Sequence, residues 1–168
     1  MKYQTAVVFG GGAFGTSIAS VLAENFNQVI IKVRSKDVYE SINAGENSVY
    51  LPGQKLNSNI CSALTWEELD KKIADNKVEL IVNGLPTGAI NTFYSQNKKR
   101  VEEYFEAGVP LISISKGIDP DTLEMSDDLF QDHFPHFQDQ ITYLSGPSFA
   151  KEIIDKQITV VALAGKVP

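Results

Sequence analysis

Short runs of apolar, largely β-branched residues alternate along the chain with segments whose apolar positions recur every three or four residues. The short runs are continuous rather than alternating, which is typical of strands buried on both faces of a parallel sheet. Strands are expected at residues 5–9, 29–33, 59–64, 79–83, 109–114, 141–144 and 158–164. Helices are expected at residues 12–24, 37–43, 65–74 and 148–155 and between 83 and 109, with a loop at 47–56.

Strands that alternate with helices predict βαβ units. The expected fold class is therefore α/β, with a doubly wound, mostly parallel sheet and helices on both of its faces. A chain of 168 residues corresponds to one domain of this kind, spanning residues 1–168. Within it, Thr65 and Glu68 have the spacing of a capping box at the start of a helix.

The charge balance and the cysteine count exclude several classes of protein. Asp and Glu number 21 against 15 Lys and Arg, so the net charge of −6 argues against a general nucleic-acid binder. Cys61 is the single cysteine, which leaves no intrachain disulfide or cysteine-based zinc site and favours the reducing cytoplasm. Because Pro135 separates His133 from His136, the two imidazoles are not expected to share a helical face, and no metal site is predicted.

An uncharged stretch at residues 3–23 invites comparison with a signal peptide or a membrane span. Glycine, serine and threonine interrupt it, whereas a span needs about 20 mostly apolar residues. A strand, a turn and a helix explain this stretch better, and no membrane span is expected.

The sharpest motif is GGGAFG at residues 10–15, which satisfies G-x-G-x-x-G. Gly10 allows a tight turn after the strand, Gly12 lets a pyrophosphate approach the backbone, and Gly15 lets the helix pack closely on the sheet. The free N–H groups and the dipole at the helix N-terminus favour an anion. Because the motif follows an expected strand and opens an expected helix, it predicts a Rossmann-type dinucleotide site. A glycine turn without a ligand is the alternative.

The end of the second expected strand bears on cofactor preference. An NAD site usually places a carboxylate there for the ribose 2′-hydroxyl, but residues 32–36 of this chain contain none. Arg34 and a neighbouring lysine could instead pair with a 2′-phosphate, which favours NADP. An exposed basic strand end is the alternative, so both NADP and NAD stay open.

Ligands of open α/β sheets bind beyond the carboxyl ends of the strands, so the other strand ends are also candidates. Pro86 follows the strand at 79–83 and keeps its loop extended beside the expected cleft. Lys116 follows the strand at 109–114, where its ammonium could meet a phosphate or polarise an oxygen, unless it is a solvated surface lysine. Residues 145–150 form a turn that feeds a helix and offer a second anion site.

Together these motifs resemble the NAD(P)-dependent glycerol-3-phosphate dehydrogenase family over nearly the whole chain. The matching segments are GGGAFGTSIA (10–19), NSVYLPG (47–53), SKGID (115–119) and SGPSFAKE (145–152). The resemblance implies that NADP or NAD contacts Ala13, Phe14, Lys116 and Ala150 and has its adenosine ribose near Arg34. The expected cofactor contacts also include Gly10, Gly12 and Gly15 of the motif and Pro86 at the strand end. The resemblance also implies that Lys116 is catalytic and that Lys116, Gly146 and Ser148 contact the substrate.

The activity implied by the resemblance is reversible reduction of dihydroxyacetone phosphate to sn-glycerol 3-phosphate by hydride transfer, which feeds phospholipid synthesis. The family often has Trp where Lys32 stands and a V-P-S-like turn at residues 85–87, so cofactor preference stays open. Family members continue into a helical domain that carries a second catalytic lysine. Residues 165–168 resemble the start of a linker, so the chain is expected to be the coenzyme-binding part and inactive alone. An apolar face left uncovered could produce a homodimer.

Three other interpretations remain. Another two-domain NAD(P)-dependent dehydrogenase, acting on a hydroxy acid or a sugar nucleotide, should lack the paired S-K-G and S-G-P-S-F-A motifs. A non-catalytic Rossmann module that senses a dinucleotide would suit a short native chain. A plain structural domain would leave the glycine turn without a ligand.

Overall fold

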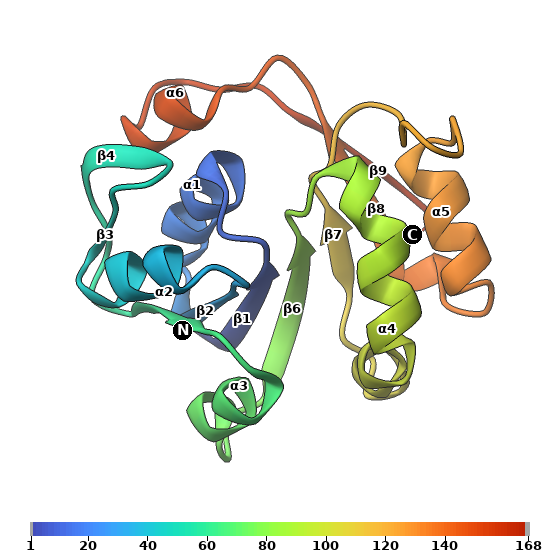
Figure 1. Cartoon of the computed structure of the whole chain (residues 1–168), viewed down its shortest axis with the longest axis horizontal. Coiled ribbons are helices and arrows are strands. Elements are labelled where there is room, and N and C mark those ends of the chain that lie inside the picture. Colours follow the sequence, from blue (N-terminus) through green and yellow to red (C-terminus); the bar gives the residue numbers. More distant parts are fainter. Residues whose placement is uncertain (1, 167–168) are drawn as a thin grey trace.

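A computed structural model of the chain describes residues 2–166, so Val167 and Pro168 of the expected linker lie outside the described residues (Figure 1). One sheet has the strand order β5-β2-β1-β6-β7-β8-β9. Its strands are β1 (Tyr3–Phe9), β2 (Phe26–Lys32), β5 (Ile60–Ala63), β6 (Val78–Asn83), β7 (Leu111–Ser113), β8 (Ile141–Ser145) and β9 (Ala162–Gly165). All neighbouring strands are parallel except β8 and β9, which confirms the doubly wound, mostly parallel sheet.

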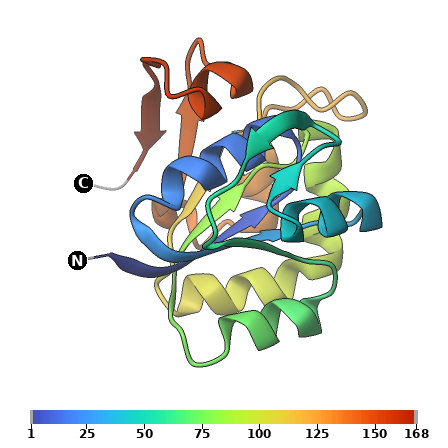
Figure 2. The ribbon, with the colours of Figure 1, turned by 90° about the vertical axis from the view of Figure 1, so that its left-hand side faces the viewer.

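Helices cover both faces of this sheet, as Figure 1 shows for α1 and α2 on one side and α4 and α5 on the other. They are α1 (Ala13–Leu22), α2 (Lys36–Asn43), α3 (Trp66–Ile73), α4 (Thr87–Glu106), α5 (Ser126–His133) and α6 (Ala150–Ile154), with a 3₁₀ turn at Gln138–Gln140. Figure 2 shows α6 and β9 at one end of the molecule, far from α3.

The two faces hold two separate apolar cores because successive side chains of a strand point in opposite directions. In β1, Val7 and Phe9 pack with α3, α4 and α5, whereas Ala6 and Val8 pack with α1 and α2. All four are fully buried, which explains why the strand is a continuous apolar run rather than an alternating one.

The expected loop at 47–56 is wrong, because this segment completes a small antiparallel hairpin. Its strands are β3 (Glu46–Asn47) and β4 (Leu51–Lys55). Leu51 is buried and Asn47 is completely buried, so two side chains fix the hairpin to the domain. Pro52 is tolerated because a two-stranded ribbon has an unpaired edge.

Other element boundaries also differ from expectation. The helix expected at 148–155 begins at Ala150, and the strand expected at 158–164 forms only at Ala162–Gly165. Helix α5 was not expected; it buries Leu129 and Phe130 against the face that α4 covers. The Thr65 hydroxyl accepts from the Glu68 N–H at 3.1 Å, but the Glu68 carboxylate accepts from the N–H of Leu64 instead of completing the capping box.

Candidate functional site

The glycine turn lies where the strand order reverses between β1 and β6, the place at which such sheets bind ligands. Gly10 has a φ of 107°, and a Cβ there would lie 2.6 Å from the carbonyl oxygen of Gly84. The Gly84 N–H in turn donates to the Phe9 carbonyl at 2.8 Å. The turn after β1 and the loop after β6 are therefore in direct backbone contact, which only a glycine at position 10 permits.

The other two glycines of the motif differ in what surrounds them. A Cβ on Gly15 would collide with the carbonyl oxygen of Gly10, so helix α1 packs directly on the turn. A Cβ on Gly12 would meet nothing within 4 Å. Packing within the protein therefore explains Gly15 but not Gly12, whose open side adjoins the free N–H groups of the first turn of α1. An anionic ligand fits this position.

A buried asparagine that the sequence left without a role holds the glycine turn in place. The Asn47 amide nitrogen donates to the Gly11 carbonyl at 2.9 Å and lies 2.8 Å from the Thr16 hydroxyl. Both partners are more than 30 residues away in the sequence. The hairpin of β3 and β4 thus positions the turn, and the only signal for this in the sequence is that Asn47 opens the NSVYLPG segment.

Three of the predicted residues, Phe14 for the cofactor and Gly146 and Ser148 for the substrate, lie around the Lys116 ammonium group. The Lys116 Nζ lies 4.7 Å from the centre of the Phe14 ring, a cation–π distance. It donates to the Ser148 hydroxyl at 2.9 Å and to the Gly146 carbonyl at 3.1 Å. Lys116 follows β7, the other two follow β8, and Phe14 stands in the first turn of α1. The site thus gathers a cation, a hydroxyl and an aromatic ring at the carboxyl edge of the sheet.

Ala150 and Pro86 border this cluster. The Ser17 hydroxyl donates to the Ala150 carbonyl at 2.8 Å, which holds the start of α6 against α1. Pro86 is exposed and caps the N-terminus of α4 with a φ of −56°. The next residue, Thr87, donates its hydroxyl proton to the Lys116 carbonyl at 2.9 Å. Ala150 therefore lies against α1, and Pro86 lies next to a residue that is bonded to the loop of Lys116.

Arg34 is exposed at the end of β2 and makes no hydrogen bond or ion pair with any residue between 2 and 166. The neighbouring lysines are engaged elsewhere. The Lys32 ammonium donates to the Leu64 carbonyl at 2.8 Å, and burial lowers the pKa of Lys32. Lys36 pairs with Glu40 at 3.5 Å. A 2′-phosphate near this strand end would thus meet Arg34 rather than Lys32.

The remaining candidates form no site of their own. His133 ends α5, where its Nε2 lies 3.0 Å from the Asn91 side-chain oxygen, and burial lowers its pKa. Within residues 2–166, no three His, Cys, Asp or Glu side chains are grouped as metal ligands. None of the described helices combines the length and apolarity needed to cross a membrane.

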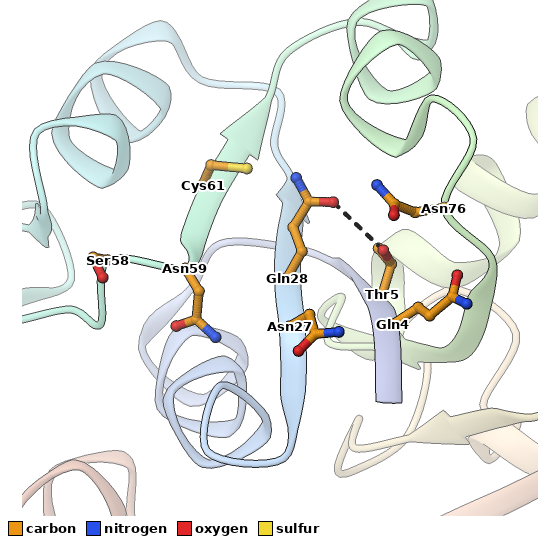
Figure 3. A pocket seen from close by; sticks show the side chains of 8 residues that line it. All are labelled: Gln4, Thr5, Asn27, Gln28, Ser58, Asn59, Cys61 and Asn76. Carbon is orange, nitrogen blue, oxygen red and sulfur yellow. Dashed lines mark hydrogen bonds between the residues drawn. The ribbon is translucent and has the colours of Figure 1, made fainter. Parts of the chain in front are cut away.

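A separate pocket of about 400 Å³ lies at the opposite, amino-terminal edge of the sheet (Figure 3). Its lining is amides, hydroxyls and one thiol, without a charged side chain: Gln4, Thr5, Asn27, Gln28, Ser58, Asn59, Cys61 and Asn76. Burial raises the pKa of the Cys61 thiol, which makes it a poor nucleophile. Because it lies across the sheet from the glycine turn and offers no cation, this pocket is not part of the candidate site.

Comparison with known proteins gives concordant results. The family described as "NAD-dependent glycerol-3-phosphate dehydrogenase N-terminus" matches residues 5–167. Glycerol-3-phosphate dehydrogenase [NAD(P)+] of Leptospira biflexa is 32% identical over 161 residues, covering 95% of this chain and 46% of that protein. The Myxococcus xanthus protein of the same name is 34% identical over 159 residues, covering 94% and 45%. The chain thus spans about half the length of the curated relatives it matches.

Solved structures show the same fold. A crystal structure of glycerol-3-phosphate dehydrogenase from Coxiella burnetii matches with a TM-score of 0.75 and 21% identity, covering 96% of this chain and 46% of that one. GDP-mannose dehydrogenase from Pseudomonas aeruginosa matches with a TM-score of 0.62 and 16% identity, covering 96% and 41%. At these identities the likeness concerns the fold alone.

Proposed function

Because the chain belongs to the N-terminal domain family of NAD-dependent glycerol-3-phosphate dehydrogenases, we propose that it is the coenzyme-binding part of such an enzyme. The proposed reaction is hydride transfer between NAD(P)H and dihydroxyacetone phosphate, which gives sn-glycerol 3-phosphate for phospholipid synthesis. The bound cofactor supplies the hydride. The chain's own residues bind the dinucleotide and orient the reacting groups.

The observation that supports this proposal best is the convergence on Lys116. Its ammonium, 2.9 Å from the Ser148 hydroxyl, is the cation that a carbonyl oxygen needs when hydride addition makes it negative. The Lys116 Nζ also lies over the Phe14 ring. Lys116 therefore contacts both the proposed substrate residues and the glycine turn. We assign Lys116 to substrate polarisation, and Ser148 and Gly146 to substrate contact.

The dinucleotide half of the proposal rests on the glycine turn. Gly12 leaves open space beside the N-terminus of α1, as a pyrophosphate requires. We also assign six other residues to cofactor binding: Gly10, Ala13, Phe14, Gly15, Pro86 and Ala150. We assign Arg34 to the adenosine ribose, where a 2′-phosphate would give the guanidinium a strong partner and favour NADP over NAD.

Hydride transfer to a carbonyl also needs a proton donor, and we assign that role to no residue of this chain. We therefore propose that residues 1–168 bind the cofactor without turning over substrate. Two measurements test this: calorimetric titration with NADPH and NADH, and an assay of cofactor oxidation with dihydroxyacetone phosphate. Binding without turnover is the expected result. Absence of binding would contradict the cofactor assignment, and brisk turnover would contradict the division of roles.

Assembly is a separate proposal. The segment before and within β9 exposes large apolar side chains, among them Ile158 at 99%, Val160 at 73% and Leu163 at 60%. Apolar side chains exposed together favour association. We propose that the 168-residue chain forms a homodimer through this segment. Sedimentation of the chain and of a Leu163→Ser variant tests it, and a wild-type monomer at high concentration would contradict it.

A further inference from the structure

A completely buried amide lies directly behind the loops that border Lys116. Asn83 is the last residue of β6 and has no exposed surface. Its Nδ2 donates to the Ser115 hydroxyl at 2.8 Å and to the Ser113 hydroxyl at 3.1 Å, while its Oδ1 accepts from the Tyr94 hydroxyl at 3.0 Å. Burial raises the pKa of Tyr94 well above its ordinary value, so this hydroxyl stays a donor. Every polar group of the Asn83 side chain is therefore satisfied.

The two serine partners of Asn83 differ in what they do next. Ser115 donates its own hydroxyl proton to the Leu85 carbonyl at 2.5 Å, so the chain of bonds runs from β6 through the loop after β7 and back to the loop after β6. Ser113 is the last residue of β7, and among residues 2–166 its hydroxyl donates no hydrogen bond to either loop. The Asn83 side chain thus reaches the loop of Pro86 through the Ser115 hydroxyl. This link adds to the direct bond that the Thr87 hydroxyl donates to the Lys116 carbonyl.

Burying a polar side chain at this position of β6 costs folding free energy unless its hydrogen bonds are satisfied. Ile81 and Val82, the two residues before it in β6, are apolar and buried. An amide buried among them is tolerated only while all of its partners are in place, and such satisfied networks hold their members rigidly. This network therefore restricts the movement of two loops, the one after β6 that holds Pro86 and the one after β7 that holds Lys116. Both loops border the proposed cofactor and substrate sites.

We propose that Asn83 is a positioning residue of the coenzyme site. Through the Ser115 hydroxyl it holds the loop of residues 84–86 against the loop of Lys116, and so sets the spacing between Pro86 and the Lys116 ammonium. The inference rests on the proposed function, because it assigns the spacing to cofactor binding. It does not make Asn83 a catalytic residue, since its side chain is enclosed by Ser113, Ser115 and Tyr94.

The two serines give a matched pair of variants, which avoids removing the buried amide and unfolding the chain. Ser115→Ala breaks the bond to Leu85, whereas Ser113→Ala removes one acceptor from Asn83 and leaves that bond intact. Ser115→Thr restores a hydroxyl. Each variant is examined by amide hydrogen exchange at residues 84–87 and 115–117, by thermal unfolding, and by calorimetric titration with NADPH and NADH.

We expect Ser115→Ala to lose affinity about tenfold and to exchange faster in both loops, because small displacements of positioning groups weaken a site steeply. Ser113→Ala should bind within about twofold of wild type although its unfolding temperature also falls. Ser115→Thr should recover most of the affinity.

Equal affinities for Ser115→Ala and Ser113→Ala, or an unchanged exchange pattern in Ser115→Ala, would overturn the positioning role. A wild-type chain that binds neither cofactor would overturn the proposed function instead. In that case the exchange comparison would still decide whether the Ser115 hydroxyl, which Asn83 holds, couples the two loops.

Discussion

Substituting the glycines at positions 12 and 15 separates ligand binding from packing within one motif. The open space beside Gly12 and the crowding of Gly15 against the Gly10 carbonyl predict opposite results for the same added methyl group. Gly12→Ala should fold normally and lose cofactor affinity. Gly15→Ala should lose stability because its methyl group has no space.

The magnitudes follow from the surroundings of each position. Gly12 has φ −70° and ψ 175°, which alanine adopts without strain. Restricting the unfolded chain stabilises by about 0.4–1 kcal/mol, and the poorer helix cap that alanine makes costs a similar amount, so stability should change by less than about 1 kcal/mol. A methyl group in the path of the pyrophosphate should weaken binding at least tenfold, which is about 1.4 kcal/mol.

At Gly15 the overpacking cost lies in the upper part of the usual range, about 2–3 kcal/mol, and the better helix propensity of alanine offsets roughly 1 kcal/mol of it. The atom in the way belongs to the backbone, which cannot rotate aside. We expect a net loss of about 1–2 kcal/mol, or a fall in Tm of roughly 2–8 °C for a chain of this size.

The assays are thermal unfolding by circular dichroism and calorimetric titration with NADPH, performed on wild type and both variants. A Gly12→Ala protein that binds NADPH as tightly as wild type would refute the placement of the pyrophosphate. A Gly15→Ala protein with the wild-type Tm would refute the packing argument.

Three further substitutions test other parts of the account. Asn47→Ala leaves the Gly11 carbonyl without its buried partner, and a cost of about 1–3 kcal/mol should lower the Tm in thermal unfolding; an unchanged Tm would contradict the role of the hairpin. Arg34→Gln should reduce NADPH affinity about tenfold and leave NADH affinity unchanged in calorimetry, and equal effects on both would contradict the 2′-phosphate assignment. His133 has a pKa lowered by burial from 6.5, so below pH 6.5 the unfolded chain binds the proton more readily and stability falls as pH drops toward the lowered pKa. Urea unfolding at about pH 7 and about pH 5.5 should show this loss reduced in His133→Gln but not in the control His136→Gln, and identical losses in both variants would contradict it.

The parts of the fold that sequence predicted well are those set by local constraints. The run from Thr5 to Phe9 is mostly apolar and β-branched, and three glycines follow it. This pattern predicts a buried strand that ends in a tight turn. The close contact that Gly15 makes with Gly10 agrees with the packing expected from the motif. Continuous apolar runs elsewhere likewise predicted a parallel sheet covered on both faces.

The parts that sequence could not predict depend on residues far apart in the chain. Asn47 acts on the glycine turn, and Asn83 bonds a helix residue 11 positions away and serines 30 and 32 positions away. The hairpin of residues 46–55 has few apolar positions, with Leu51 as its one buried apolar side chain, so it lacks a periodic signal. Polar residues buried by tertiary contacts leave no pattern of their own.

The candidate site shows the same division. The strand-end rule alone picked out Pro86 and Lys116, because the carboxyl ends of parallel strands share one edge. That the Lys116 ammonium lies over Phe14 and against Ser148 required the fold, since these residues come from three separate segments. The engagement of Lys32 with the Leu64 carbonyl, which leaves Arg34 alone at the strand end, also depends on the neighbouring strand.

The central claim is that a dinucleotide binds at the carboxyl edge of the sheet, over the glycine turn. Its most direct test is to record backbone amide shifts by NMR while the chain is titrated with NADPH. We predict the largest changes at Gly11, Gly12 and Phe14 and in the loop of Lys116, with Thr5, Gln28 and Asn76 of the opposite pocket unmoved. Changes confined to that opposite pocket, or spread evenly over the sheet, would contradict the account.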